Sequence, residues 1–292
     1  MGVKDFYQRH HYKLFWIPII LILISLISLG IGYLTNGEVI QRDVSLKGGI
    51  SANLVTAQNI DVKALEEFLS SKLDAEVSVR SLVDFTTREQ SGLIIETSSL
   101  ESNRLKEALK DKIAFEDDKI SIEEVGPSLG GAFFKQMITA ILVAFLLMAI
   151  VVFVMFRSFA PSLAVVLAAF GDMIVTLAIL SLIGFELSIT SIAGFLLIIG
   201  YSIDTDMLLT SRVLKRRGEG SVMDRIFGAF KTGLTMTLTT LIALIVAYFI
   251  TNSLVLKGIF TIIIIALIVD LLMTWLMNTS ILIMYCKKKG IS

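Results

Sequence analysis

Four aspartates lie within long apolar stretches of this sequence, where a charged side chain is costly. They are Asp172, Asp204, Asp206 and Asp270. On insertion scales, an ionised carboxylate at the middle of a membrane costs about 2.5–3.5 kcal/mol. A carboxyl group placed there must be protonated, hydrated or paired with a partner. The chemistry that this setting suits is the uptake and release of a proton or another ion, so these four residues are the candidate coupling residues.

Asp204 and Asp206 are two residues apart, or roughly 200° around a helix, so they cannot share a face. Asp206 aligns with Ser202 and Thr210, whereas Asp204 aligns with Gly200. We expect one of these two faces to meet the other helices of the chain and the other to meet a partner. We rank Asp204 first for coupling and Asp206 second, because Gly200 lets a neighbouring helix come close and shield the carboxyl group.

Each aspartate also has a structural alternative. Asp204 and Asp206 lie near one end of their stretch, and their side chains can reach the boundary beside Arg212. Asp172 and Asp270 lie near the middle of theirs, where a protonated carboxyl group can simply bond to a neighbouring helix. No lysine or arginine of the chain lies deep within an apolar stretch, so none is available there to pair with an aspartate.

Further polar residues are candidates for a supporting role. Thr205 lies between Asp204 and Asp206 in the sequence. Lys231 precedes the threonine run "TGLTMTLTT" at 232–240. Hydroxyl groups of this run, such as that of Thr235, can bond a facing aspartate. Alternatively, they bond back to their own helix, as threonines in apolar helices often do. The supporting candidates are Thr205, Ser202, Arg212, Lys231 and Thr235.

The elements that carry these residues are membrane helices. Hydrophobic residues make up 55% of the 292 residues and gather in blocks of about twenty, which is typical of a polytopic membrane protein. We expect six transmembrane helices, the last five within 135–286. Their approximate bounds are 14–34, 136–156, 160–183, 188–210, 233–250 and 259–285.

Lysine and arginine placement predicts the orientation. Basic residues gather before the first span, in the loop 212–231 and after the last span. With six spans these segments share one side, so the termini, 1–13 and 287–292, are expected to be cytoplasmic. The basic loop is interpreted as charge beside anionic lipid, or as a docking site for a translocon or ribosome.

Residues 35–134 are then a single extracytoplasmic domain. Its pattern predicts strands at 50–56, 76–85, 92–97 and 119–125, with amphipathic helices at 61–73 and 101–113. The order βαββαβ is that of a ferredoxin-like α+β domain. Two glycines just after the first span, Gly48 and Gly49, either permit close backbone approach where this domain meets the membrane or form an ordinary turn.

Three motifs resemble the SecF family, whose members are the smaller membrane subunits of the SecD–SecF export complex and belong to the RND-type transporter superfamily. They are "VSLKGGI" (44–50), "VGPSLGGAFFKQMITAIL" (125–142) and "IGYSIDTDMLLTSRVLKR" (199–216). In the bacterial pattern "GYSINDT" the aspartate falls on Thr205 here, and Asp204 stands where SecD has its own aspartate. Asp172 matches a family aspartate, whereas Asp270 replaces a residue that is usually glycine. The pattern resembles the archaeal branch.

The resemblance implies an accessory subunit that promotes preprotein export across the plasma membrane, coupled to the proton or ion motive force. It implies four partners: a SecD-like subunit, a SecYEG-type translocon, the translocating preprotein and membrane lipid. We expect no enzyme activity, catalytic residue, cofactor, metal site or nucleic-acid partner, because no nucleotide motif or metal-ligand cluster occurs.

Two other functions are compatible with the residues. An intramembrane aspartyl protease needs two facing carboxyl groups that share a proton, and "AAFGD" is one residue from a Gly-x-Gly-Asp pattern. A half-subunit of an RND-type small-molecule exporter would also carry six spans and need a second half.

Overall fold

The computed structural model describes residues 3–56, 58–83, 90–98, 101–216, 218, 220–251 and 253–291. The chain forms two compact units. The first consists of Met1–Gln41, Thr139–Glu186 and Thr190–Ser292, and the second of Arg42–Ile138 and Leu187–Ile189. Most of the residues expected to form the extracytoplasmic domain, 35–134, therefore belong to the second unit.

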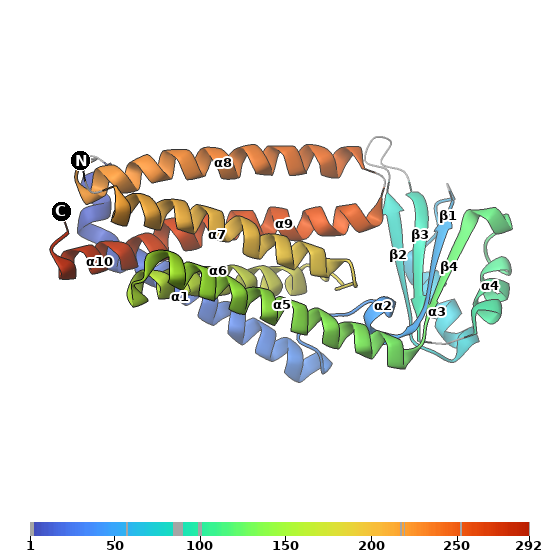
Figure 1. Ribbon diagram of the computed structural model, residues 1–292. Helices are drawn as coiled ribbons and strands as arrows, with labels where there is room; N and C mark the ends of the chain where they lie inside the picture. Colours follow the sequence, from blue (N-terminus) through green and yellow to red (C-terminus); the bar gives the residue numbers. More distant parts are fainter. Residues whose placement is uncertain are drawn as a thin grey trace. The chain divides into compact units, whose positions relative to one another are not determined.

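Among the described residues, six helical stretches are long and apolar enough to cross a membrane, as predicted. They are Arg9–Thr35, Pro127–Phe156, Phe159–Leu182, Ser191–Lys215, Val222–Ile250 and Val255–Lys289. The helices that contain them are α1 (Val3–Asn36), α5 (Pro127–Phe156), α6 (Phe159–Leu182), α7 (Ser191–Lys215), α8 (Val222–Ile250), α9 (Leu254–Leu272) and α10 (Thr279–Lys289) (Figure 1).

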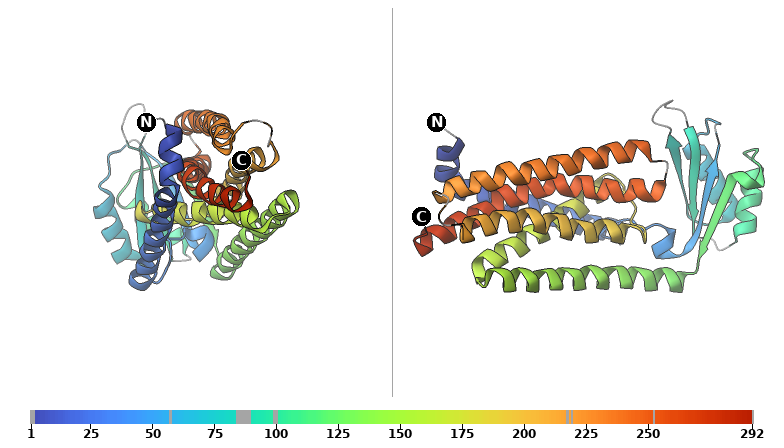
Figure 2. Two further views of the ribbon diagram at one scale, coloured as in Figure 1. Left: turned by 90° about the vertical axis from the view of Figure 1, so that its left-hand side faces the viewer. Right: turned by 45° about the horizontal axis from the view of Figure 1, so that its top comes forward.

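Helices α6, α7 and α9 pack against one another and form the centre of the first unit. An end-on view shows the long helices gathered side by side (Figure 2). The helix α9 continues into α10 through a π-helical segment, Met273–Asn278. Such segments are rare and often occur at functional sites.

Helix α8 begins well before the expected boundary at 233. Ser221 accepts a hydrogen bond from the backbone N–H of Asp224, and the Asp224 side chain accepts one from the backbone N–H of Ser221, which is a capping box. Ile226 and Ala229 are buried in the same apolar cluster as Leu209 of α7. Much of the expected loop 212–231 is therefore helix, and Arg217 lies outside the described residues.

The second unit contains a four-stranded antiparallel sheet with two helices, which confirms the βαββαβ order. Its strands lie in the spatial order β2-β3-β1-β4. The elements are β1 (Gly49–Val55), α3 (Val62–Leu73), β2 (Val77–Val83), β3 (Gln90–Thr97), α4 (Ser102–Lys110) and β4 (Ile120–Val125). Positions 84 and 85 of the expected second strand lie outside the described residues.

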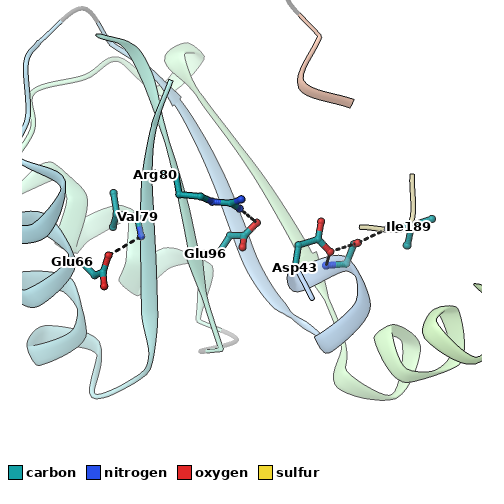
Figure 3. A network of polar contacts seen from close by, with 7 residues as sticks. Asp43, Glu66, Val79, Arg80, Glu96 and Ile189 are labelled. Atoms are coloured by element: carbon teal, nitrogen blue, oxygen red, sulfur yellow. Dashed lines mark hydrogen bonds and ion pairs between the residues drawn. The ribbon is translucent and has the colours of Figure 1, made fainter. Parts of the chain in front are cut away.

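The core of the second unit follows from simple periodicities. Ile50, Ala52 and Leu54 alternate along β1 toward the helices, and Leu65 and Leu69 of α3 are buried against them. Figure 3 shows two polar ties. The side chain of Glu66 accepts a hydrogen bond from the backbone N–H of Val79 at 3.3 Å, and Arg80 pairs with Glu96 across two strands at 3.1 Å.

The glycine pair permits a close backbone approach within the second unit. Gly48, at φ +88°, ends the short helix α2 (Val44–Lys47), and a Cβ there would lie 2.5 Å from Cα of Pro127. A Cβ on Gly130 would lie 2.7 Å from the backbone nitrogen of Gly48. The motif after the first span thus packs directly against the start of α5. Nearby, the Ser45 hydroxyl oxygen accepts a hydrogen bond from the backbone N–H of Ile189 at 3.0 Å.

Candidate functional site

Three of the four aspartates meet inside the first unit. Asp172 comes from α6, Asp206 from α7 and Asp270 from α9, and all three are at most 1% exposed. Gly171, next to Asp172, lies close to its neighbours: a Cβ there would lie 2.9 Å from Cδ1 of Ile22 and 3.0 Å from the sulfur of Met273. We call Asp172, Asp206 and Asp270 together the aspartate cluster.

The cluster is bound into one hydrogen-bond network by side chains from α7 and the π-helical segment. The Thr205 hydroxyl donates to Asp270 at 2.9 Å, and the Ser202 hydroxyl donates to Asp172. Asp206 accepts from Asn278 Nδ2 at 2.7 Å. The network also holds Thr274, whose hydroxyl lies 2.9 Å from Asp206 Oδ1 and 3.0 Å from Asp270 Oδ1.

An ionised carboxylate only accepts hydrogen bonds, so each buried carboxylate oxygen of the cluster needs a donor. Within the described part of the chain, Asp172 Oδ1 and Asp206 Oδ2 are buried without a hydrogen-bond partner. A buried carboxylate oxygen without a donor is costly, and a proton relieves that cost.

Asp204 lies apart from this cluster. It is exposed on the surface of the first unit, as is Gly200, and a Cβ at Gly200 would meet no atom within 4 Å. The expectation that a neighbouring helix shields Asp204 is therefore wrong for the described helices of this chain. The opposite face of α7 has that role: Ser202, Asp206 and Thr210 are all at most 1% exposed.

Some of the supporting candidates belong to the buried network, and others lie on the surface of the first unit. Ser202 and Thr205 belong to the network, whereas Lys231 and Thr235 are exposed. The Thr235 hydroxyl donates to the backbone oxygen of Lys231 at 2.8 Å, so the structure has the alternative in which threonines of α8 bond their own helix. Arg212 Nη1 donates to the hydroxyl oxygen of Thr232 at 3.3 Å, which ties α7 to α8 at their ends.

Sequence reasoning missed Thr274 and Asn278, although a signal was present. Thr274 follows Asp270 by four residues, so it lies on the same helical face. Asn278, four residues further on, keeps that alignment only because of the π-helical segment. Both are fully buried, and both donate to Asp206. Across the ranges that the structure describes, no group of three or more His, Cys, Asp or Glu residues is placed to hold a metal ion.

Comparison with known proteins decides the family. The family model for the C-terminal region of protein-export membrane proteins SecD and SecF matches residues 104–288. Protein-export membrane protein SecF of Methanolacinia petrolearia is 36% identical over 278 residues, which cover 94% of this chain and 93% of the relative. The chain belongs to the SecF family. SecF of Pyrococcus furiosus is 34% identical, and the match covers 95% of this chain and 92% of that relative. SecF of Methanocaldococcus jannaschii is 35% identical, and the match covers 92% of this chain and 93% of that relative.

A solved structure shares the fold of this SecF-family chain. SecDF from Thermus thermophilus, described as a translocon-associated membrane protein, superimposes with a TM-score of 0.75 at 20% identity. The match covers 99% of this chain but only 40% of the SecDF chain. A second SecDF structure, in a super-membrane-facing form, gives a TM-score of 0.59 over 95% of this chain.

Membership of this family establishes the general function. The chain is a membrane subunit of protein export and an accessory of Sec translocation. The SecF relatives are protein-export membrane proteins rather than enzymes, so the family does not support the alternative of an aspartyl protease.

Proposed function

We propose that this SecF-family chain couples the movement of protons, or of another ion, to protein export through the aspartate cluster. The observation that carries the proposal is the meeting of three carboxyl groups from three separate helices in one buried network. A change in the protonation of such a group alters the contacts among α6, α7 and α9 together. It therefore shifts the balance between packed arrangements of the bundle.

The energy available is sufficient for such a shift. Moving one elementary charge through 100 mV releases about 2.3 kcal/mol. A difference of that size changes the ratio of two conformations by more than tenfold, since about 1.4 kcal/mol corresponds to a factor of ten. In this proposal the coupled motion is passed to the extracytoplasmic domain, which engages the emerging preprotein.

The partners and the orientation are part of the same proposal. Asp204 and Gly200 lie on an exposed face of α7, which suits contact with a second six-helix subunit of the SecD type. The complex acts beside a SecYEG-type translocon in the plasma membrane, with both termini cytoplasmic. This arrangement gives the cluster the leading role in coupling. Asp204 contributes only contact surface to the partner, and an asparagine of the same size supplies that surface equally.

The test replaces each aspartate with asparagine, which keeps the size and hydrogen bonding of the side chain but removes its titration. Secretion of a reporter preprotein is followed in cells, with and without an uncoupler. We expect Asp172→Asn, Asp206→Asn and Asp270→Asn to lose the uncoupler-sensitive part of secretion. Asp204→Asn, the matched control from the same helix, keeps it. Normal uncoupler-sensitive secretion in all three cluster variants would refute the proposal.

A further inference from the structure

The hydroxyl group of Thr274 lies between two carboxyl groups of the network. Its hydroxyl oxygen lies 2.9 Å from Asp206 Oδ1 and 3.0 Å from Asp270 Oδ1, and the residue is fully buried. A hydroxyl group has one hydrogen to donate and two lone pairs to accept. It can satisfy both carboxyl groups only by donating to one and accepting from the other. The second carboxyl group must then be protonated.

We propose that Thr274 is a proton-relay residue between Asp270 and Asp206. The inference rests on the proposed coupling function and names the residue through which the cluster exchanges its proton. It concerns a side chain of the π-helical segment rather than another carboxyl group.

The transfer balances without a further reactant. When Asp270 is protonated, its O–H donates to the Thr274 oxygen while the Thr274 O–H donates to ionised Asp206. In one concerted step the Asp270 proton moves to the Thr274 oxygen, and the original Thr274 proton moves to Asp206 Oδ1. Asp270 ends ionised, Asp206 ends protonated, and Thr274 ends as a hydroxyl group whose hydrogen points the other way. A simple rotation of the hydroxyl resets it.

The neighbouring hydroxyl groups do not offer the same path. The Thr205 hydroxyl oxygen lies 2.9 Å from Asp270 Oδ2 and 2.9 Å from the backbone oxygen of Ser202, and Ser202 donates to Asp172. Within the described ranges, Thr274 alone has a hydroxyl group bonded to both Asp206 and Asp270. Since both carboxyl groups are at most 1% exposed, transfer through the hydroxyl group avoids the need for bulk water.

The geometry of the helix supports this role. In a regular α-helix, residues eight apart drift by about 80° around the axis. In a π-helical turn the hydrogen bonds run from i to i+5, so each residue turns by less. The segment Met273–Asn278 therefore keeps Thr274 and Asn278 aligned with Asp270, facing α7. Without it, the second donor to Asp206 would rotate away.

The experiment compares Thr274→Val, which keeps the shape but removes the hydroxyl group, with Thr274→Ser, which keeps the hydroxyl group. Each variant replaces the native chain in cells, and the uncoupler-sensitive rate of reporter secretion is measured. We expect about a tenfold or greater loss in Thr274→Val and recovery of most of the rate in Thr274→Ser. The matched control is Thr235→Val, whose hydroxyl group bonds its own helix, and it should keep the native rate.

Two further variants make the outcome decisive. The double variant Asp206→Asn with Thr274→Val should be no slower than Asp206→Asn alone, because both interrupt one path. If Thr274→Val fails to accumulate, Thr274→Cys serves instead, since a thiol is a weak donor of similar size, and we expect the same loss. A native rate in Thr274→Val or Thr274→Cys, with Asp206→Asn inactive, overturns the relay but leaves the proposed coupling intact. A native rate in Asp206→Asn also overturns the relay, and a native rate in all three cluster variants overturns both proposals.

Discussion

Asp206 and Asp204 lie close together in the sequence but have opposite surroundings in the structure. Two donors from the π-helical segment, Thr274 and Asn278, bond the same carboxylate oxygen of Asp206, whereas Asp204 is exposed. The two aspartates differ by only two positions in the sequence. Their roles differ because a helix turns by about 100° per residue, so one carboxyl group enters the network and the other leaves the chain's interior.

Asn278→Ala should destabilise the first unit by about 1 kcal/mol, the range found for hydrogen bonds between membrane helices. The change removes the 2.7 Å bond from Nδ2 to Asp206, which is buried. The measurement is the midpoint of thermal unfolding in detergent micelles. Thr239→Ala is the control, because its exposed hydroxyl group bonds its own helix, and it should unfold at the native temperature. Equal midpoints for both variants would contradict this account of Asp206.

Residue types are enough to recognise the candidate aspartates, but they do not tell which of the aspartates come together in the structure. Asp172, Asp206 and Asp270 are recognisable because a carboxyl group in an apolar stretch is costly, and Ser202 follows from helical alignment with Asp206. The helix that was expected to shield Asp204 at Gly200 is absent from the described part of the chain, because which face of α7 is covered depends on contacts between helices far apart in the sequence.

At the scale of elements, local rules account for most of the structure. Asp61 accepts hydrogen bonds from the backbone N–H groups of Lys63 and Ala64, and α3 begins beside it as expected for a capping aspartate. The strands of the second unit are predicted by the alternation of apolar and polar residues along the sequence. The early start of α8 was missed because the capping box at Ser221 and Asp224 lies in a strongly basic stretch that reads as a loop. The π-helical segment carries no comparable signal in the sequence.

Two adjacent glycines of α5 offer a test of the contact with α2. Gly130→Ala should destabilise the second unit by about 1–3 kcal/mol, because its Cβ would lie 2.7 Å from the backbone nitrogen of Gly48. Gly131→Ala should be neutral or stabilising by up to about 1 kcal/mol, since nothing lies within 4 Å of its Cβ and alanine favours a helix. Chemical unfolding of the two variants makes the comparison. Equal loss of stability in both would show that the close approach is absent.

At the scale of the whole molecule, the distribution of basic residues predicts that the termini are cytoplasmic. Cysteine introduced at Asn103, an exposed residue of the second unit, should react with a membrane-impermeant thiol reagent in intact cells. Cysteine at Gly218, also exposed, should react only after the membrane is opened. The native Cys286 is 1% exposed and adds little background. Labelling in the reverse order would invert the proposed topology.

In the proposed function, the aspartate cluster moves protons or another ion while the chain works in export. The most direct measurement is proton uptake by liposomes that hold the chain with its six-helix partner, followed with an internal pH dye under an imposed membrane potential. For proton coupling, the native complex should acidify the lumen, the Asp206→Asn complex should not, and the Asp204→Asn complex should behave like the native one. Equal acidification by the native and Asp206→Asn complexes would contradict the account.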